Sequence, residues 1–203
     1  MVSFTRCCRS STTELPGKSR FLWVVVGVLL WLGVATTGRA QGIYIKSAEL
    51  APTESGYSLD ATYDVALTSV LTEALTRGLG LTFVTEFELG SPRWWTFGLW
   101  NRTVSEFRTQ QRLSFSALTR QYRLSFGAVN QTFDSLTEAL AVVGRIHYAP
   151  AVRFQEVEPG KVYLAAVRLW LDTSQLPKPL QIDALGSSDW NLASDWFRWT
   201  FKP

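Results

Sequence analysis

Apolar and polar residues alternate along most of the chain after residue 41. In residues 57–65, 79–89, 122–126 and 196–201, apolar and polar side chains take turns at a period of two. This period is typical of antiparallel strands that turn one face to the core and one face to water. Residues 161–172 are apolar on both sides, which indicates a central strand. The pattern predicts a mostly antiparallel sheet system of eight or nine strands.

Two segments follow the helical period instead. The apolar positions in residues 67–75 and in residues 136–143 each form one helical stripe, and a glycine follows each stripe. Ser135 and Glu138 have the spacing of a capping box at the start of the second stripe. We therefore predict an α+β fold with two short helices in one domain. Either a sandwich of two sheets or an open, strongly curved sheet satisfies this pattern.

A weak internal repeat accompanies the two predicted helices. The motif Tyr-x-Leu that begins at Tyr57 recurs at Tyr122, and the run Leu-Thr-Glu-Ala-Leu at residues 71–75 recurs at residues 136–140. Both motifs recur at the same offset of 65 residues. One interpretation is a duplicated strand-strand-helix-strand-strand unit. The alternative is chance convergence on residues that favour helices.

The first 40 residues have the pattern of a secretory signal peptide. Residues 1–20 are polar with four cationic side chains, residues 21–37 are uncharged and mainly apolar, and Gly38 and Ala40 precede a cleavage point with small side chains. An uncleaved signal-anchor has the same charge asymmetry. We therefore expect residues 42–203 to be a single exported domain. It lies in the periplasm if cleavage follows Ala40, and otherwise stays anchored to the inner membrane from the periplasmic side.

The charge of the predicted mature domain is close to zero. Residues 1–40 hold five of the 20 basic and one of the 17 acidic residues, which leaves 15 basic against 16 acidic side chains. Such a balance predicts no nucleic-acid partner and no membrane contact except through the N-terminal segment. Cys7 and Cys8 both precede the apolar run, so the mature domain is predicted to have no disulfide. Arginine alternates with tryptophan in residues 196–199, which favours cation–π stacking within the fold.

Catalytic residue patterns are weak. His147 is the only histidine, and the chain has no G-x-S-x-G motif and no phosphate-binding glycine loop. A Ser-His-Asp triad would have to use His147, a Cys-His pair lacks a mature cysteine, and a zinc site would need an improbable set of carboxylates beside the one histidine. Glu86 with Glu88, and Asp60 with Asp64, share predicted strand faces, and paired carboxylates hydrolyse glycosides. A solvated sheet face also explains both pairs. We predict no enzyme activity and no catalytic, cofactor or metal site, with a carbohydrate hydrolase as the weakest alternative.

Tryptophans and a proline pair define a candidate interaction surface. Adjacent tryptophans on a strand point to opposite faces, and tryptophan is enriched at binding hot spots. Two prolines around one lysine predict a stiff, extended and exposed connector. Burial of the tryptophans by another layer, and a rigid loop that closes the domain, are the alternatives. The candidate residues are Trp94, Trp95, Pro177, Lys178, Pro179 and Trp190.

The C-terminal part resembles a known family. Residues 171–180 read Leu-Asp-Thr-Ser-Gln-Leu-Pro-Lys-Pro-Leu, with Asp-Trp at 189–190 and Ser-Asp-Trp at 194–196 further on. This resembles a proteobacterial family of exported proteins catalogued as a domain of unknown function. Some of its members are labelled "proline-rich signal peptide protein". The resemblance covers most of residues 42–203 and implies an envelope location in a Gram-negative bacterium, with no established activity.

The resemblance also implies a partner. Relatives are often encoded beside a nitrogen-type two-component sensor kinase, which implies a signalling-accessory role beside a membrane sensor kinase or another envelope protein. From the residues themselves, we expect a non-enzymatic module that binds a protein partner. A binder of a small ligand or lipid, with a cavity between the sheet and the helices, is the alternative.

Overall fold

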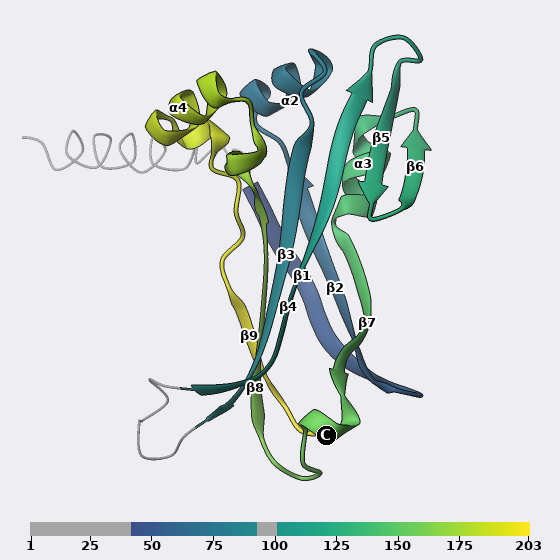
Figure 1. Ribbon diagram of the computed structural model, residues 1–203, viewed down its shortest axis with the longest axis vertical. Helices are drawn as coiled ribbons and strands as arrows, with labels where there is room; N and C mark the ends of the chain where they lie inside the picture. Colours follow the sequence, from purple (N-terminus) through teal and green to yellow (C-terminus); the bar gives the residue numbers. More distant parts are fainter. Residues whose placement is uncertain (1–41, 93–100) are drawn as a thin grey trace, which may run out of the picture. The chain divides into compact units, whose positions relative to one another are not determined.

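The computed structural model describes residues 42–92 and 101–203, which form two antiparallel sheets (Figure 1). The first sheet has the strand order β1–β2–β7, and the second has the order β6–β5–β4–β3–β8–β9. The strands are β1 (Gly42–Thr53), β2 (Gly56–Ala66), β3 (Leu81–Pro92), β4 (Asn101–Ser116), β5 (Gln121–Phe126), β6 (Val129–Phe133), β7 (Arg145–Arg153), β8 (Tyr163–Leu171) and β9 (Phe197–Phe201). These nine strands of the described ranges confirm the predicted α+β fold with mostly antiparallel sheets. The predicted signal segment, residues 1–40, lies outside the described residues.

Three helices connect the strands within the described ranges. They are α2 (Ser69–Thr76), α3 (Leu136–Val143) and α4 (Lys178–Gly186), with short 3-10 turns η2 (Phe154–Glu156), η3 (Thr173–Gln175) and η4 (Ser188–Trp190). The helices α2 and α3 are the two predicted ones. The Thr68 hydroxyl caps α2, and the Ser135 hydroxyl caps α3 by accepting a hydrogen bond from the Glu138 main-chain N–H at 3.1 Å. No helix in this part of the chain is long and apolar enough to cross a membrane.

The prediction that residues 177–179 form an extended connector is wrong. Pro177 immediately precedes α4, and Pro179 lies in the first turn of the helix. A proline fits there because the first helical N–H groups have no partner inside the helix and its fixed φ suits the helix. The Gln181 side-chain amide then donates to the carbonyl of Leu176 at 2.7 Å and ties the helix to the preceding turn.

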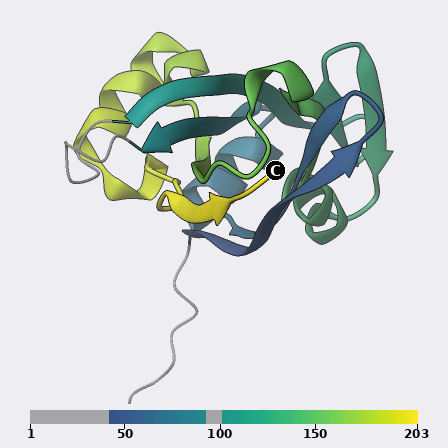
Figure 2. The ribbon, with the colours of Figure 1, turned by 90° about the horizontal axis from the view of Figure 1, so that it is seen from below.

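The two sheets share one core, as the sandwich alternative predicted. Seen from below, β1 lies on the opposite side of the core from β3 and β4 (Figure 2). The Phe107 ring of β4 stacks on Tyr148 of β7 at 4.1 Å between ring centroids, and Tyr57 of β2 meets Phe201 of β9 edge-on at 4.9 Å. The second sheet is wider, so the first sheet covers only part of its inner face. Residues 41–203 form one compact unit with this core.

The predicted repeat appears in the order of the elements but not in their pairing. The order strand-strand-helix-strand-strand occurs as β1–β2–α2–β3–β4 and again as β5–β6–α3–β7–β8. However, β2 pairs with β7, whereas β3 pairs with β4 and β8. A shift of 65 residues also aligns the single strand β2 with the hairpin β5–β6, which contains two strands. The duplication therefore stays a prediction.

Candidate functional site

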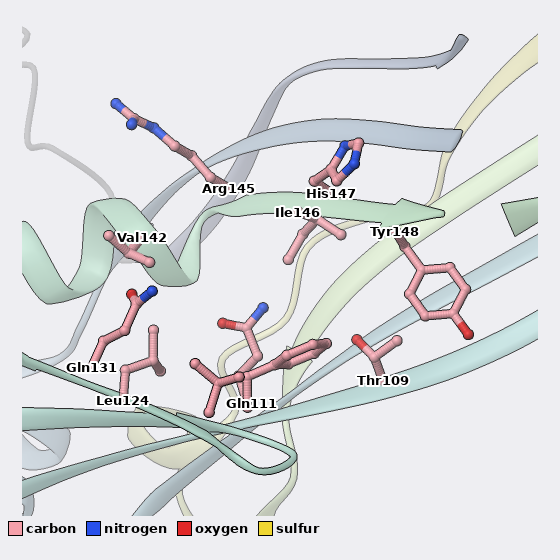
Figure 3. Close-up of a pocket in the computed structure, with 11 residues that line it drawn as sticks. Thr109, Gln111, Leu124, Gln131, Val142, Arg145, Ile146, His147 and Tyr148 are labelled. Atoms are coloured by element: carbon pink, nitrogen blue, oxygen red, sulfur yellow. The ribbon is translucent and has the colours of Figure 1, made fainter. Parts of the chain in front are cut away.

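A half-open pocket lies where the wider sheet extends beyond the narrower one (Figure 3). Its volume is about 220 Å³, and it lies between α3 and β7 on one side and the strands β4, β5 and β6 on the other. We call it the edge pocket. The residues that line it are Thr109, Gln111, Leu124, Phe126, Val129, Gln131, Val142, Arg145, Ile146, His147 and Tyr148.

Strand register places the apolar wall of the edge pocket. Gln111 of β4 pairs with Phe126 of β5, and Phe126 pairs with Val129 of β6, so the three side chains stand in one row on the inner face. Phe126 is 42% exposed and Val129 is 56% exposed, because no strand of the narrower sheet covers them. Each exposed apolar Å² costs about 25 cal/mol relative to burial. An apolar group seated here would recover part of that free energy.

Two side-chain amides point from the wider sheet towards α3 and β7, those of Gln111 and Gln131 (Figure 3). Gln111 is 8% exposed as a residue, and its amide is not among the buried polar atoms that lack a hydrogen-bond partner in the described residues. The amide faces the cavity, where it can bond water or a ligand. Gln131 is exposed at the rim, where water can satisfy its amide. The edge pocket therefore offers two side-chain amides to a ligand.

The opposite wall of the edge pocket is an open strand edge. The Gly144 carbonyl accepts a hydrogen bond from the Tyr63 N–H at 2.7 Å, where β2 meets the start of β7. Antiparallel main-chain groups alternate in direction, so those of Ile146 face β2 and those of Arg145 and His147 face away from it. The side chains of Arg145 and His147 also point away from the cavity (Figure 3). These two residues therefore line the pocket with their main chain, and no described strand pairs with that edge.

His147 belongs to a polar network on the outer face of the first sheet. Its Nδ1 lies 2.6 Å from Asp60 Oδ1, and the Ser58 hydroxyl donates to Asp60 Oδ2 at 3.1 Å. A carboxylate that orients an imidazole is one half of a catalytic triad. In the described residues, however, no hydroxyl is hydrogen-bonded to the ring, and Ser58 is bonded to the carboxylate instead. The network holds the ring in place, and the His147 side chain is 68% exposed.

Glu86 forms a second polar centre, on the outer face of the wider sheet. The carboxylate is 4% exposed and accepts hydrogen bonds from Arg108 Nε at 2.7 Å and Arg168 Nε at 2.8 Å. Burial alone would raise the pKa of Glu86, but the two guanidinium groups outweigh burial and hold the pKa below its usual range. The Trp196 ring covers the Arg168 guanidinium at 4.5 Å and lies 5.9 Å from that of Arg198, which confirms the predicted cation–π stacking.

Three of the four acids considered for glycoside hydrolysis are held in ion pairs, whereas Glu88 is exposed and faces Glu106 on β4. Glu86 is bound to two arginines and is held ionised, so it cannot act as the general acid. Asp60 is bound to His147, and Asp64 lies 3.4 Å from Lys46 Nζ. Within residues 42–92 and 101–203, no group of three metal-ligating side chains could hold a metal ion.

The sequence of the two-sheet domain matches a known protein family. Residues 40–200 match the model of a family described as a domain of unknown function, DUF4390. The chain belongs to the DUF4390 family. No curated protein and no solved structure matches it. The family match confirms the resemblance of residues 171–196 to a domain of unknown function, and it covers the described residues as far as residue 200.

The residues of the predicted interaction surface of this DUF4390 domain do not lie together in one described patch, and the surface stays a prediction. Trp94 and Trp95 lie outside the described residues. The three residues 177–179 are exposed together at the start of α4. Trp190 is 6% exposed, because η4 places it in the core beside α2 and α4, so the prediction that it offers a contact surface is wrong. None of these described residues lines the edge pocket.

Sequence reasoning missed the edge pocket of the DUF4390 domain. One signal was available, since Phe126 and Val129 flank Gly127, whose φ of +55° marks a tight turn. Two large apolar residues on either side of an exposed hairpin turn are unexpected unless something covers them. The rest of the site depends on β7, which lies across the pocket through long-range pairing that no local pattern reveals.

Proposed function

We propose that the chain is a non-catalytic binding module of the cell envelope whose ligand seats an apolar group in the edge pocket. The observation that carries the proposal is the combination of exposed apolar side chains, two side-chain amides and an open strand edge around one cavity. Convergence of apolar lining with a few polar groups in a pocket is typical of binding sites. The engaged acids and the isolated His147–Asp60 pair favour binding over catalysis.

The size of the edge pocket favours a protein partner over a complete small ligand. Pockets for drug-sized molecules span about 300–1,000 Å³, whereas a cavity of about 150 Å³ is enough for benzene. At about 220 Å³, the edge pocket suits one aromatic or large aliphatic side chain. We therefore rank a protein-interaction module above a binder of whole lipids.

Export is part of the proposal. The N-terminal charge and apolar pattern supports delivery of residues 42–203 to the periplasm, either free after cleavage at Ala40 or anchored to the inner membrane. The partner would then be another envelope protein. A membrane sensor kinase is the candidate that the family resemblance suggests.

A dye titration tests whether the edge pocket binds apolar groups. Anilinonaphthalene sulfonate carries aromatic rings of suitable size, and its fluorescence rises in apolar sites. With residues 41–203, we expect saturable binding that Val129→Asp weakens about tenfold or more, since tenfold corresponds to about 1.4 kcal/mol. Leu118→Asp is the matched control because Leu118 is 95% exposed at the neighbouring hairpin turn. Equal affinities in the two variants would refute the proposed site.

A second candidate function has its own observation. A groove of about 390 Å³ lies between α2 and α4 and is lined by Val70, Ala74, Leu79, Leu180 and Trp190, together with Glu73, Arg77 and Gly78. Its size and apolar lining suit part of an acyl chain, as the small-ligand or lipid alternative requires. In the same titration, Leu180→Asp rather than Val129→Asp would then abolish dye binding.

A further inference from the structure

We infer that the ligand of the edge pocket is an extended, acidic peptide segment of a partner protein that pairs as a strand with the open edge of β7. This inference rests on the proposed function and specifies its partner. Only a polypeptide offers alternating N–H and C=O groups at the spacing of a strand edge. The main-chain groups of Arg145 and His147 present such an edge, and they line the cavity.

The open stretch of β7 is short and has a defined end. Further along the strand, the Ala151 carbonyl accepts a hydrogen bond from the Ser105 hydroxyl of β4 at 3.2 Å, so the two sheets close on each other there. The Phe107–Tyr148 stack marks the start of the closed part. An added strand therefore pairs with residues 145–148 and leaves the cavity where the sheets meet.

Alternation fixes what the added strand must carry. One side chain of the peptide would point inward, between Phe126 and Val129 on one wall and Ile146 on the other. The Gln111 amide lies on the wall facing the added strand and can bond its main chain. The side chains on either side of the inward one would point to the outer face of the first sheet, beside Arg145.

Charge complementarity indicates that these outward residues are acidic. Arg145 is exposed and makes no ion pair within the described ranges. None of the residues that line the edge pocket is a carboxylate. The nearby Asp60 is already bound to His147, and Asp64, which lines a neighbouring pocket with Arg145, is paired with Lys46. An acidic side chain opposite Arg145 would form a cross-strand ion pair, whereas a basic one would be repelled.

The test uses residues 41–203 and a set of seven-residue probe peptides, Thr-Thr-Glu-X-Glu-Thr-Thr, in which X is Phe, Tyr, Trp or Leu. We expect saturable binding of at least one probe and slowed hydrogen exchange of the Arg145 and His147 amides in the complex. Arg145→Glu should reverse the charge preference, so that it binds the same peptides better when both glutamates are lysines. Arg102→Glu, at an exposed arginine on β4, is the control and should keep the original preference.

Three outcomes would overturn the inference. The first is that no probe at millimolar concentration protects the two amides, and the proposed function survives this result if the dye still binds. The second is an unchanged charge preference in Arg145→Glu. The third is protection of the two amides in the absence of peptide together with a dimer in sedimentation, which would make a second copy of the chain the occupant. The proposed function itself would be refuted if neither the dye nor any probe peptide binds to the wild type or to any of the variants.

Discussion

Two polar centres of the same sheet differ in how completely they are satisfied. Glu86 is almost fully buried on the outer face, and both of its oxygens accept hydrogen bonds from arginines on the neighbouring strands. Gln111 lies on the inner face three residues along β4 from Arg108, and its amide points into the edge pocket. A buried polar group is expensive unless it is bonded. The first centre therefore serves the fold, and the second one has bonding capacity left for a ligand.

The apolar side chains around Glu86 and around Gln111 also differ in how completely they are covered. Around Glu86, the Trp196 ring lies over Arg168 and shields the ion pair. Around Gln111, Phe126 and Val129 remain exposed and nothing in the described residues covers them. Polar groups that face the cavity and uncovered apolar side chains thus occur together at the edge pocket. Their coincidence, rather than either feature alone, distinguishes a binding site from a structural cluster.

The largest expected effect is loss of stability when the Glu86 carboxylate is removed. Glu86→Ala leaves Arg108 and Arg168 facing each other without a counter-ion. Breaking a buried pair costs about 3–5 kcal/mol. Because the Arg108 side chain is 69% exposed and partly screened, we expect a smaller loss of about 2–3 kcal/mol. Urea unfolding should show a lower midpoint with an unchanged slope.

Glu88→Ala is the matched control for this loss. Glu88 lies on the same strand and the same face but is exposed, and it faces Glu106 on β4. Its removal should change the free energy of unfolding by no more than about 0.5 kcal/mol. Equal losses in the two variants would mean that the ion-paired cluster has no special role in the fold.

The stability of the same cluster should depend on pH. Arg168 and Arg108 lower the pKa of Glu86 in the folded state, so the unfolded chain binds its proton more readily. The contribution of Glu86 to stability is therefore fully present above the ordinary value of 4.5 and is lost as pH falls through the folded-state value. Below about pH 4.5, the difference in unfolding free energy between wild type and Glu86→Gln should shrink.

Another carboxylate supplies the internal control for this measurement. Burial raises the pKa of Glu156, but hydrogen bonds from Arg153 outweigh it and the pKa is lowered overall. Glu156 therefore contributes its own pH dependence in wild type and variant alike, and that contribution cancels in the difference. A difference that stays constant from about pH 6 to pH 3 would show that Glu86 titrates alike in both states.

Local patterns predicted those parts of the fold that depend on local chemistry. Alternation identified the strands with one core face, and a serine before a helical stripe identified the start of α3. The sequence pattern did not predict strand β6, because four of its five side chains are exposed and its sequence has no apolar alternation. The prolines of residues 177–179 predict an extended segment, but they also fit the first turn of a helix. The local sequence does not distinguish between these two conformations.

The candidate site could not be predicted because it arises from long-range pairing. Gln111 meets Phe126 through the β4–β5 register, but β7 reaches the other wall only by pairing with β2. Asp60 and His147 lie 87 residues apart in the chain. Glu86 likewise meets Arg168 through a register that spans 82 residues. The residue types in the sequence identify the polar groups. Only the pairing of the strands determines which of these groups have hydrogen-bond partners.

The smallest expected effect is also the most direct test of the contrast between the two centres. Gln111→Leu replaces an amide that faces the edge pocket with an apolar side chain of similar length. Because the position is only 8% exposed, an apolar side chain there should raise the free energy of unfolding by about 0.5–1 kcal/mol, the opposite sign from Glu86→Ala. The same variant should bind the acidic probe peptides more weakly, because the amide no longer bonds their main chain.

Gln110→Leu is the matched control for this gain. Gln110 is adjacent on β4 but exposed on the outer face, so its replacement should leave stability within about 0.5 kcal/mol and peptide binding unchanged. A loss of more than about 1 kcal/mol in Gln111→Leu would reveal an internal role for the amide. Gln111 would then resemble Glu86, and the edge pocket would lose the feature that separates it from a structural cluster.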